Sequence, residues 1–260
     1  MTRIVTALIL IPFVAWVTLA SPQWVFLAVL AITALLAYSE FDHIAGAQGI
    51  TRAGLPGMAA GLALLLAPNP AVTVVLIAML GMVLALRVEN LAAALPAAAA
   101  FTLGIIYIFG AWRCAAGLRA ISPHWLLFAM LLSWAGDIAA LYIGSSFGKH
   151  KMAPLVSPAK SWEGAAGSVV GGMLAGGIYA HYLIPQAPLA EALVLAAAGN
   201  IAGQLGDLCE SALKRGAGVK DSGTLLPGHG GWLDRIDSSL FSVPAVYALL
   251  KLFETAQAAM

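Results

Sequence analysis

Residues 91–112 read LAAALPAAAAFTLGIIYIFGAW, an apolar run of 22 residues without a charged side chain. A helix that crosses the hydrocarbon core of a membrane needs about 20 such residues. The whole chain has the same character, since 61% of its 260 residues are hydrophobic, 10% are charged and the mean hydropathy is +0.92. A soluble domain is about 45–50% apolar and about 25% charged. The composition therefore indicates an all-α, polytopic membrane protein, and it excludes a soluble globular domain, a disordered chain and a nucleic-acid-binding protein.

Nine segments are predicted to be membrane-spanning helices. They cover residues 4–20, 22–39, 54–67, 70–88, 91–112, 123–143, 162–184, 188–212 and 238–256. Proline and polar turn residues lie at the joints between them, as in the sequences Pro-Asn-Pro at 68–70 and Ser-Pro at 122–123. The first segment could alternatively be a signal peptide, because Arg3 precedes it and a possible cleavage site follows it. Its length and the span that follows at once favour a membrane helix.

The distribution of lysine and arginine predicts the orientation in the membrane. With nine spans, ten of the 13 basic residues lie on the side of the N-terminus, and only Arg113, Arg119 and Lys251 lie on the other side. Basic residues favour the cytoplasmic side. We therefore expect the N-terminus and the loops at 144–161 and 213–237 in the cytoplasm, and the C-terminus outside.

The first 120 residues carry few groups capable of chemistry. Glu40, Asp42 and His43 end the second segment, and we interpret them as interfacial residues of a spanning helix. The second half differs, because Asp137 lies inside an otherwise apolar segment. A carboxylate at that depth is costly unless it faces protein, water or a cation. Asp137 is therefore a candidate functional residue, with a structural hydrogen bond between helices as the alternative.

The loop after that segment combines glycines with basic residues. Lys149, Lys151 and Lys160 could bind phosphate, and Ser161 could cap the following helix, whose N-terminus attracts anions. The alternative is a basic loop that only sets the topology. In the next helix, small residues at positions 164, 168, 172 and 176 form a face that we interpret as a packing surface.

The densest cluster of polar residues lies at 203–237. Asp207, Ser211 and Lys214 are spaced to share one face of a helix, and a glycine-rich loop then leads to Asp234 and Asp237. Carboxylates beside lysines and exposed backbone are typical of a site that binds Mg²⁺ with phosphate groups. An ordinary ion pair between Lys214 and the acid four residues before it is the alternative.

Residues 211–237 resemble the signature of the phosphatidate cytidylyltransferases, also called CDP-diacylglycerol synthases. That signature reads S-x-x-K-R-x4-K-D-x5-P-x-H-G-G-x-x-D-R-x-D, and this chain matches it at every fixed position, from Ser211 to Asp237. The stretch from Asp137 through FGKHK at 147–151 to residues 162–164 also resembles the bacterial members. One departure is Ala159, which stands where a lysine is expected.

The resemblance implies an enzyme that transfers CMP from CTP to phosphatidic acid, releasing pyrophosphate and forming CDP-diacylglycerol. It further implies Mg²⁺, with K⁺ as a second possible cation, a homodimer, and the bacterial inner membrane as the location. By correspondence with the family, Asp207 and Asp234 are the metal ligands, and they are catalytic together with Ser211 and Lys214. The candidate substrate-binding residues are Asp137, Lys149, Lys160, Glu163, Arg215, Lys220, Asp221, His229, Arg235 and Asp237. In this interpretation, residues 1–120 form a transmembrane region and residues 121–260 form the catalytic region.

Two other functions are compatible with parts of the sequence. A secondary transporter would also contain an intramembrane carboxylate such as Asp137, although the sequence has no evident internal repeat. A CTP-dependent enzyme acting on another membrane lipid phosphate would have a similar set of polar residues. A CDP-alcohol phosphotransferase is disfavoured, because its D-G-x-x-A-R pattern does not occur in the chain.

The predicted orientation can be tested by labelling a single cysteine. In a variant that lacks Cys114 and Cys209, we expect Ala258→Cys to react with an impermeant maleimide on the outer side of the intact inner membrane, because an odd number of spans leaves the C-terminus outside. A matched cysteine in the 144–161 loop should react only after permeabilisation. Labelling of position 258 only after permeabilisation would contradict nine spans in this orientation.

Overall fold

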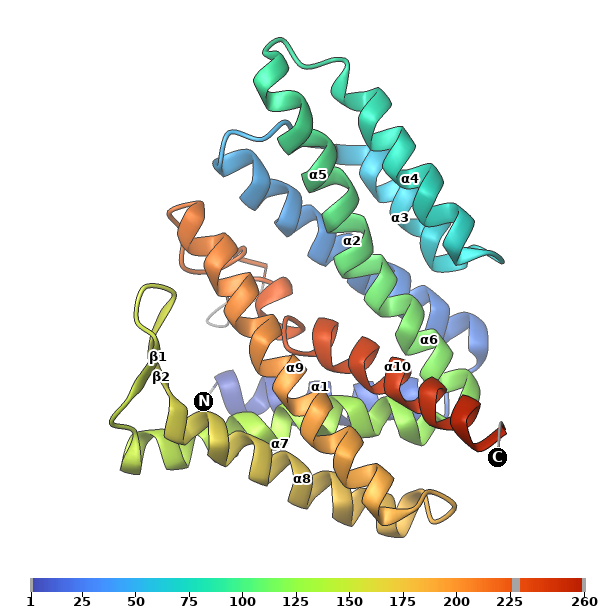
Figure 1. Ribbon diagram of the computed structural model, residues 1–260, viewed down its shortest axis with the longest axis vertical. Helices are drawn as coiled ribbons and strands as arrows, with labels where there is room; N and C mark the ends of the chain where they lie inside the picture. The colour runs from blue at the N-terminus through green and yellow to red at the C-terminus, as the bar shows by residue number, and fades with distance from the viewer. Residues whose placement is uncertain (1, 226–229, 259–260) are drawn as a thin grey trace. The chain divides into compact units, whose positions relative to one another are not determined.

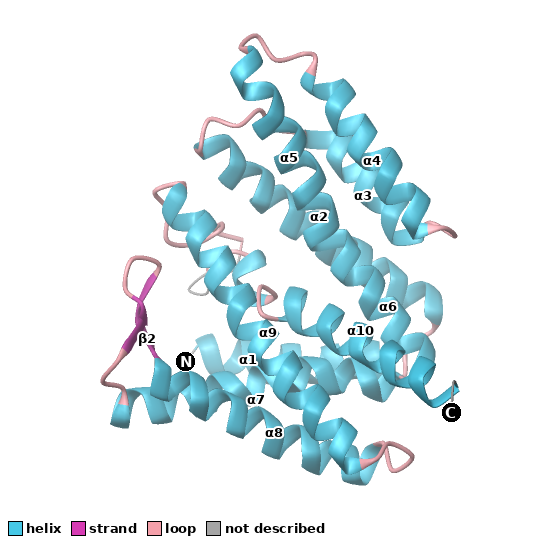
Figure 2. Ribbon diagram, in the orientation of Figure 1, coloured by secondary structure: helices cyan, strands magenta, loops and turns pink. Residues whose placement is uncertain are grey.

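The structure is a computed structural model that describes residues 2–225 and 230–258, and most of them are helical (Figures 1 and 2). The long helices are α1 (Thr2–Leu19), α2 (Gln23–Ala47), α3 (Gly54–Leu66), α4 (Pro70–Ala85), α5 (Ala94–Ile105), α6 (Ala111–Ile121), α7 (Pro123–Phe147), α8 (Trp162–Leu183), α9 (Leu189–Gly216) and α10 (Ser239–Ala258). Short helical turns are η1 (Leu91–Ala93), the π-type turn η2 (Ile106–Gly110) and η3 (Leu233–Arg235).

Each of the nine predicted segments is helical, which confirms the all-α membrane architecture. Of the helices that the structure describes, five stretches are long and apolar enough to cross a membrane: Gln23–Ala47, Leu91–Ile121, Pro123–Phe147, Leu189–Gly216 and Ser239–Ala258. Helices α3 and α4 are apolar but shorter, and α8 contains six glycines and several polar residues that dilute its hydrophobicity. The number nine for the spans therefore stays a prediction.

The described chain forms two compact units. The first unit comprises Met1–Thr6, Pro22–Arg113 and Leu213–Arg235, and the second comprises Ala7–Ser21, Cys114–Ala212 and Ile236–Met260. Each unit contains segments from both halves of the chain. The predicted division at residue 120 instead separated the chain into two consecutive regions. Helix α9 runs from the second unit into the first, so the signature residues 211–237 are distributed over both.

Close packing of α7 against α8 forms the centre of the second unit. The small residues that α8 presents at 164, 168, 172 and 176 are all buried, which confirms the predicted packing face. Asn200 of α9 donates hydrogen bonds to the carbonyl oxygen of Leu132 (3.0 Å) and to Oγ of Ser168 (3.2 Å). Such bonds between helices satisfy polar groups that neither lipid nor an apolar core can satisfy.

A two-stranded antiparallel hairpin connects α7 to α8, with strands β1 (Lys151–Ala153) and β2 (Ser157–Ser161). The sequence analysis predicted a loop here, because a hairpin this short gives no extended alternation of polar and apolar residues. Ser161 ends the second strand and caps α8, since its Oγ accepts a hydrogen bond from the backbone N–H of Gly164 at 3.2 Å. The predicted cap is confirmed.

In the first unit, α2 extends eight residues beyond its predicted end at residue 39, to Ala47. Its Asp42 is buried and accepts hydrogen bonds from the backbone N–H groups of Ala53 (2.7 Å) and Gly54 (3.2 Å), and from Nε of Arg52 (3.2 Å). This carboxylate therefore satisfies orphan backbone donors at the start of α3, which is a structural role.

The packing of α7 predicts an asymmetric response to alanine substitution. A Cβ at Gly136 would lie 2.1 Å from Nδ2 of Asn200 and 2.5 Å from Oγ of Ser168, whereas a Cβ at Gly144 would meet its nearest neighbour at 3.5 Å. Overpacking of this kind costs about 1–3 kcal/mol. We therefore expect Gly136→Ala to lower the thermal unfolding midpoint in detergent–lipid micelles and Gly144→Ala to leave it nearly unchanged. Equal midpoints for the two variants would contradict this account of the packing.

Candidate functional site

The second unit contains a cavity of about 650 Å³ lined by α7, α8, α9 and the hairpin. Its polar lining includes Asp137 from α7, Lys151 and Lys160 from the hairpin, and Gln204 and Asp207 from α9. Glycines of α7 and α8 make up part of the wall and leave space beside these side chains. Asp137, the carboxylate that the sequence singled out, thus lies on a cavity that has several polar side chains and is large enough for a phosphorylated ligand.

Two of the lining residues, Lys160 and Asp207, form an ion pair. Nζ of Lys160 lies 2.5 Å from Oδ2 of Asp207, and the other carboxylate oxygen accepts a hydrogen bond from Oγ of Ser211 at 3.3 Å. Both charged side chains remain about a third exposed, with 28% of Lys160 and 30% of Asp207 accessible. An accessible carboxylate and an ammonium group at one cavity can bind a cation and an anion together.

Glu163 has a different environment from the cavity residues. Its carboxylate accepts hydrogen bonds from the backbone N–H groups of Lys149 (3.1 Å) and His150 (3.2 Å), and it pairs with Nδ1 of His150 at 2.5 Å. Glu163 therefore holds the base of the hairpin against α8. Neither Glu163 nor the exposed Lys149 belongs to the described lining of the cavity, so the structure separates these two candidates from Asp137, Lys160 and Asp207.

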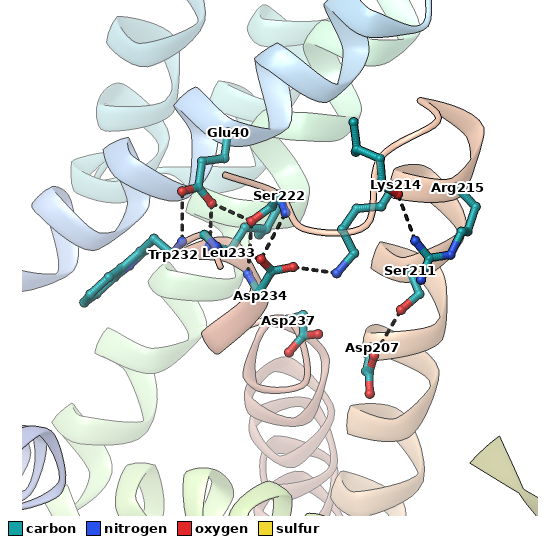
Figure 3. A network of polar contacts seen from close by, with 12 residues as sticks. Glu40, Asp207, Ser211, Lys214, Arg215, Ser222, Trp232, Leu233, Asp234 and Asp237 are labelled. Atoms are coloured by element: carbon teal, nitrogen blue, oxygen red, sulfur yellow. Dashed lines mark hydrogen bonds and ion pairs between the residues drawn. The ribbon is translucent and has the colours of Figure 1, made fainter. Parts of the chain in front are cut away.

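The first unit contains a second ion pair, between Lys214 at the end of α9 and Asp234 in η3 (Figure 3). Nζ of Lys214 lies 2.5 Å from Oδ1 of Asp234, and only 9% and 6% of the two side chains are exposed. Oδ2 of Asp234 accepts hydrogen bonds from the backbone N–H groups of Ser222 (3.0 Å) and Gly231 (2.7 Å).

The electrostatics of Asp234 follow from these contacts. Burial raises the pKa of its carboxyl group, but the hydrogen bonds from Lys214, Gly231 and Ser222 outweigh that effect and hold the pKa below its ordinary value. Asp234 is therefore a stable anion at neutral pH, and Lys214 remains beside it as its cation.

Glu40 is the functional candidate that the sequence analysis missed. Only 8% of Glu40 is exposed, and α2 continues past it to Ala47, so its carboxylate is buried within the protein. Its carboxylate accepts hydrogen bonds from Ser222, Trp232 and Leu233 (Figure 3). All three lie in the segment between α9 and α10, which we call the signature loop. A glutamate at the end of a long apolar run was the available signal, but nothing local indicates partners more than 180 residues away.

The other predicted site residues that the structure describes do not line the cavity. Arg215 is exposed and donates to the carbonyl oxygen of Val219 at 2.9 Å. Lys220, Asp221 and Arg235 are exposed. Asp237 belongs to the second unit and accepts a hydrogen bond from the backbone N–H of Ser238, just before α10. His229 lies outside the described residues.

No group of three or more potential metal ligands occurs among the residues that the structure describes. The two predicted metal ligands, Asp207 and Asp234, belong to different units, and each carries a lysine ammonium at 2.5 Å. A cation already compensates each carboxylate, and Asp207 is the one that faces a cavity.

Comparison with known families assigns these features to one enzyme class. The sequence profile described as the cytidylyltransferase family matches residues 1–253, nearly the whole chain. The chain belongs to the cytidylyltransferase family. The resemblance found in residues 211–237 is thereby confirmed, and this family relationship extends to the N-terminal helices.

Several relatives of this chain carry the name phosphatidate cytidylyltransferase. The protein from Bacillus subtilis is 41% identical over 157 residues, which make up 58% of this chain and 58% of the relative. The Haemophilus influenzae protein is 45% identical over 123 residues, 46% of this chain and 43% of the relative. The Mycobacterium tuberculosis protein is 43% identical over 143 residues, which make up 54% of this chain and 43% of the relative. The matched stretch thus spans about half the length of each relative.

Proposed function

We propose that this protein transfers CMP from CTP to phosphatidic acid, with formation of CDP-diacylglycerol and release of pyrophosphate. The observation that carries the proposal is the agreement of residues 211–237 with the family signature, together with the buried pair of Lys214 and Asp234 that this stretch builds. The names of the relatives, phosphatidate cytidylyltransferases, support the same reaction.

The chemistry of this transfer suits the residues present. The attacking group is a phosphate monoester with a second pKa of about 6, so at neutral pH it is already largely a dianion. A strong general base is therefore unnecessary. The barrier comes from bringing an anionic nucleophile to an anionic triphosphate, and fixed cations lower it. Lys160 and Lys214 are our candidates for such cations, and a carboxylate at 2.5 Å fixes the position of each ammonium group.

Helix α9 gives these groups a common support. Asp207, Ser211 and Lys214 are spaced i, i+4 and i+7 along one unbroken helix, so they lie on the same face of it. We infer that this face supports the reacting phosphate groups. Lys214 is the group that we assign to the departing pyrophosphate, and Lys160 to the binding of one anionic substrate.

Mg²⁺ is the cofactor that we propose, with K⁺ as a second candidate cation. Mg²⁺ is typically held by one or two carboxylates, waters and substrate phosphates. Asp207 fits this requirement, because its carboxylate is partly exposed on the cavity, beside the ammonium group of Lys160. Asp234, in the first unit, is the second carboxylate that we propose as a metal ligand. When bound, the metal would neutralise charge on the phosphates.

Helices long and apolar enough to cross a membrane favour a lipid substrate. Phosphatidic acid would come from the bilayer and CTP from the water on the side of the signature loop. We propose that this side is the cytoplasm and that the membrane is the bacterial inner membrane, in line with the basic residues of the loops and the bacterial relatives. A homodimer is proposed from the family resemblance.

The reaction can be tested by following both products. With CTP labelled in its α-phosphate, phosphatidic acid micelles and Mg²⁺, we expect label in a lipid and an equal amount of pyrophosphate, since CMP transfer forms one of each. Chelation of Mg²⁺ should stop both, and added Mg²⁺ should restore them. A labelled lipid formed from an isoprenoid phosphate but not from phosphatidic acid would contradict the proposed substrate, and the absence of any CTP-dependent product would contradict the enzyme class.

The role of Asp207 predicts a specific loss of turnover. We expect Asp207→Asn to lower kcat by about a hundredfold or more, because the charge that binds the metal at the reacting phosphates disappears. The matched control is Glu191→Gln on the same helix, whose carboxylate binds Gln257 and lines no part of the described cavity. This control should keep near-normal turnover. Normal activity of Asp207→Asn at limiting Mg²⁺ would refute the assignment.

A further inference from the structure

Glu40 occupies a position where a carboxylate has to be compensated. It lies in α2, an apolar helix long enough to cross a membrane, and only 8% of the residue is exposed. A buried carboxylate costs several kcal/mol unless hydrogen-bond donors surround it. Three donors do so: Oγ of Ser222 at 2.7 Å, and the backbone N–H groups of Trp232 and Leu233, each at 2.8 Å.

These donors come from the two sides of the signature loop. Ser222 lies near its start, and Trp232 and Leu233 lie near its end. The two backbone donors use different oxygens, Oε1 for Trp232 and Oε2 for Leu233, so both carboxylate oxygens are engaged. One side chain of α2 therefore joins both sides of the loop.

The same loop residues continue directly to Asp234. The hydroxyl group of Ser222 donates to Glu40 and accepts from the backbone N–H of Asp234 at 3.3 Å, while the backbone N–H of Ser222 donates to Oδ2 of Asp234. Oδ1 of Asp234 is left to Lys214. A continuous chain of contacts thus runs from Glu40 through Ser222 to the buried ion pair (Figure 3).

Glu40 leaves no room for a side chain at two glycines of the loop. A Cβ at Gly231 would lie 2.4 Å from Oε2 of Glu40 and 2.1 Å from Oγ of Ser222, and a Cβ at Gly223 would lie 2.5 Å from Oε1 of Glu40. Gly231 is one of the fixed glycines of the signature. Side chains at these two positions would therefore collide with Glu40 or Ser222.

We propose that Glu40 is a positioning residue for CMP transfer. By holding Ser222, Trp232 and Leu233, it fixes the carboxylate of Asp234 in the orientation that presents Oδ1 to Lys214. Glu40 itself touches no substrate and acts through Ser222. The inference rests on the proposed function, and it assigns to the N-terminal half of the chain a part in the geometry of the signature loop.

The test is a comparison of kcat and KM in purified protein that is first shown to be folded in micelles. Glu40→Gln keeps the size of the side chain but replaces one acceptor oxygen by an N–H donor that faces a backbone N–H. We expect kcat to fall about tenfold to a hundredfold, as for a small displacement of a reacting group, with the KM values for CTP and phosphatidic acid within about twofold of wild type. Ser222→Ala should give a similar fall, and the double variant should lose no more than the worse single variant, because both changes break one chain of contacts.

Asp42→Asn provides the matched control. Asp42 is also a buried carboxylate of α2 that binds loop N–H groups, but its partners are Ala53 and Gly54 at the start of α3. This variant should lose thermal stability and keep the wild-type kcat per folded molecule. If Glu40→Gln does not fold, Ser222→Ala carries the test alone.

Three results would overturn the positioning role: a kcat within about twofold of wild type in folded Glu40→Gln or Ser222→Ala, a rise in KM with unchanged kcat, or an equal loss of kcat in Asp42→Asn. These results are distinct from failure of the proposed function, which would appear as a wild-type protein that forms no CDP-diacylglycerol.

Discussion

Charge inside an apolar helical protein has to be compensated, and this requirement determines where the polar segments of the chain can lie. In the first unit, backbone N–H groups at the start of α3 compensate the charge of Asp42, and N–H groups of the signature loop compensate the charge of Glu40. Lys214 and Asp234 compensate each other. An unpaired carboxylate at any of these places would cost several kcal/mol. In the observed arrangement, donors of the loop meet both Glu40 and Asp234, and Asp234 in turn pairs with Lys214.

The family signature acquires a physical meaning from these contacts. Lys214 and Asp234 form the buried ion pair, and Gly231 leaves room for the carboxylate of Glu40. In the second unit, the cavity brings together Asp137, Lys160 and Asp207, which come from two helices and a hairpin. Arg215, Lys220 and Arg235 lie exposed, where they are available to water and to anionic ligands.

The elements that the sequence predicted well are those set by local patterns. Apolar runs of sufficient length located all nine helical segments, the serine before α8 was identified as its cap, and the small residues of α8 were identified as its packing face. The sequence did not predict the role of Glu40 or the partner of Lys214, because hydrogen bonds between residues 40 and 233 leave no periodic signal. The predicted helix ended at residue 39, just short of Glu40, and so gave no indication that this carboxylate is buried.

We propose that Lys214 and Asp234 act as one unit in CMP transfer. A double-mutant cycle of Lys214→Gln and Asp234→Asn, measured as kcat in detergent–lipid micelles at saturating substrates, tests it most directly. The account predicts that each single variant loses about a hundredfold in kcat and that the double variant loses no more than the worse single one, since groups that act together are not additive. Independent losses that multiply in the double variant, or a wild-type kcat in Lys214→Gln, would contradict it.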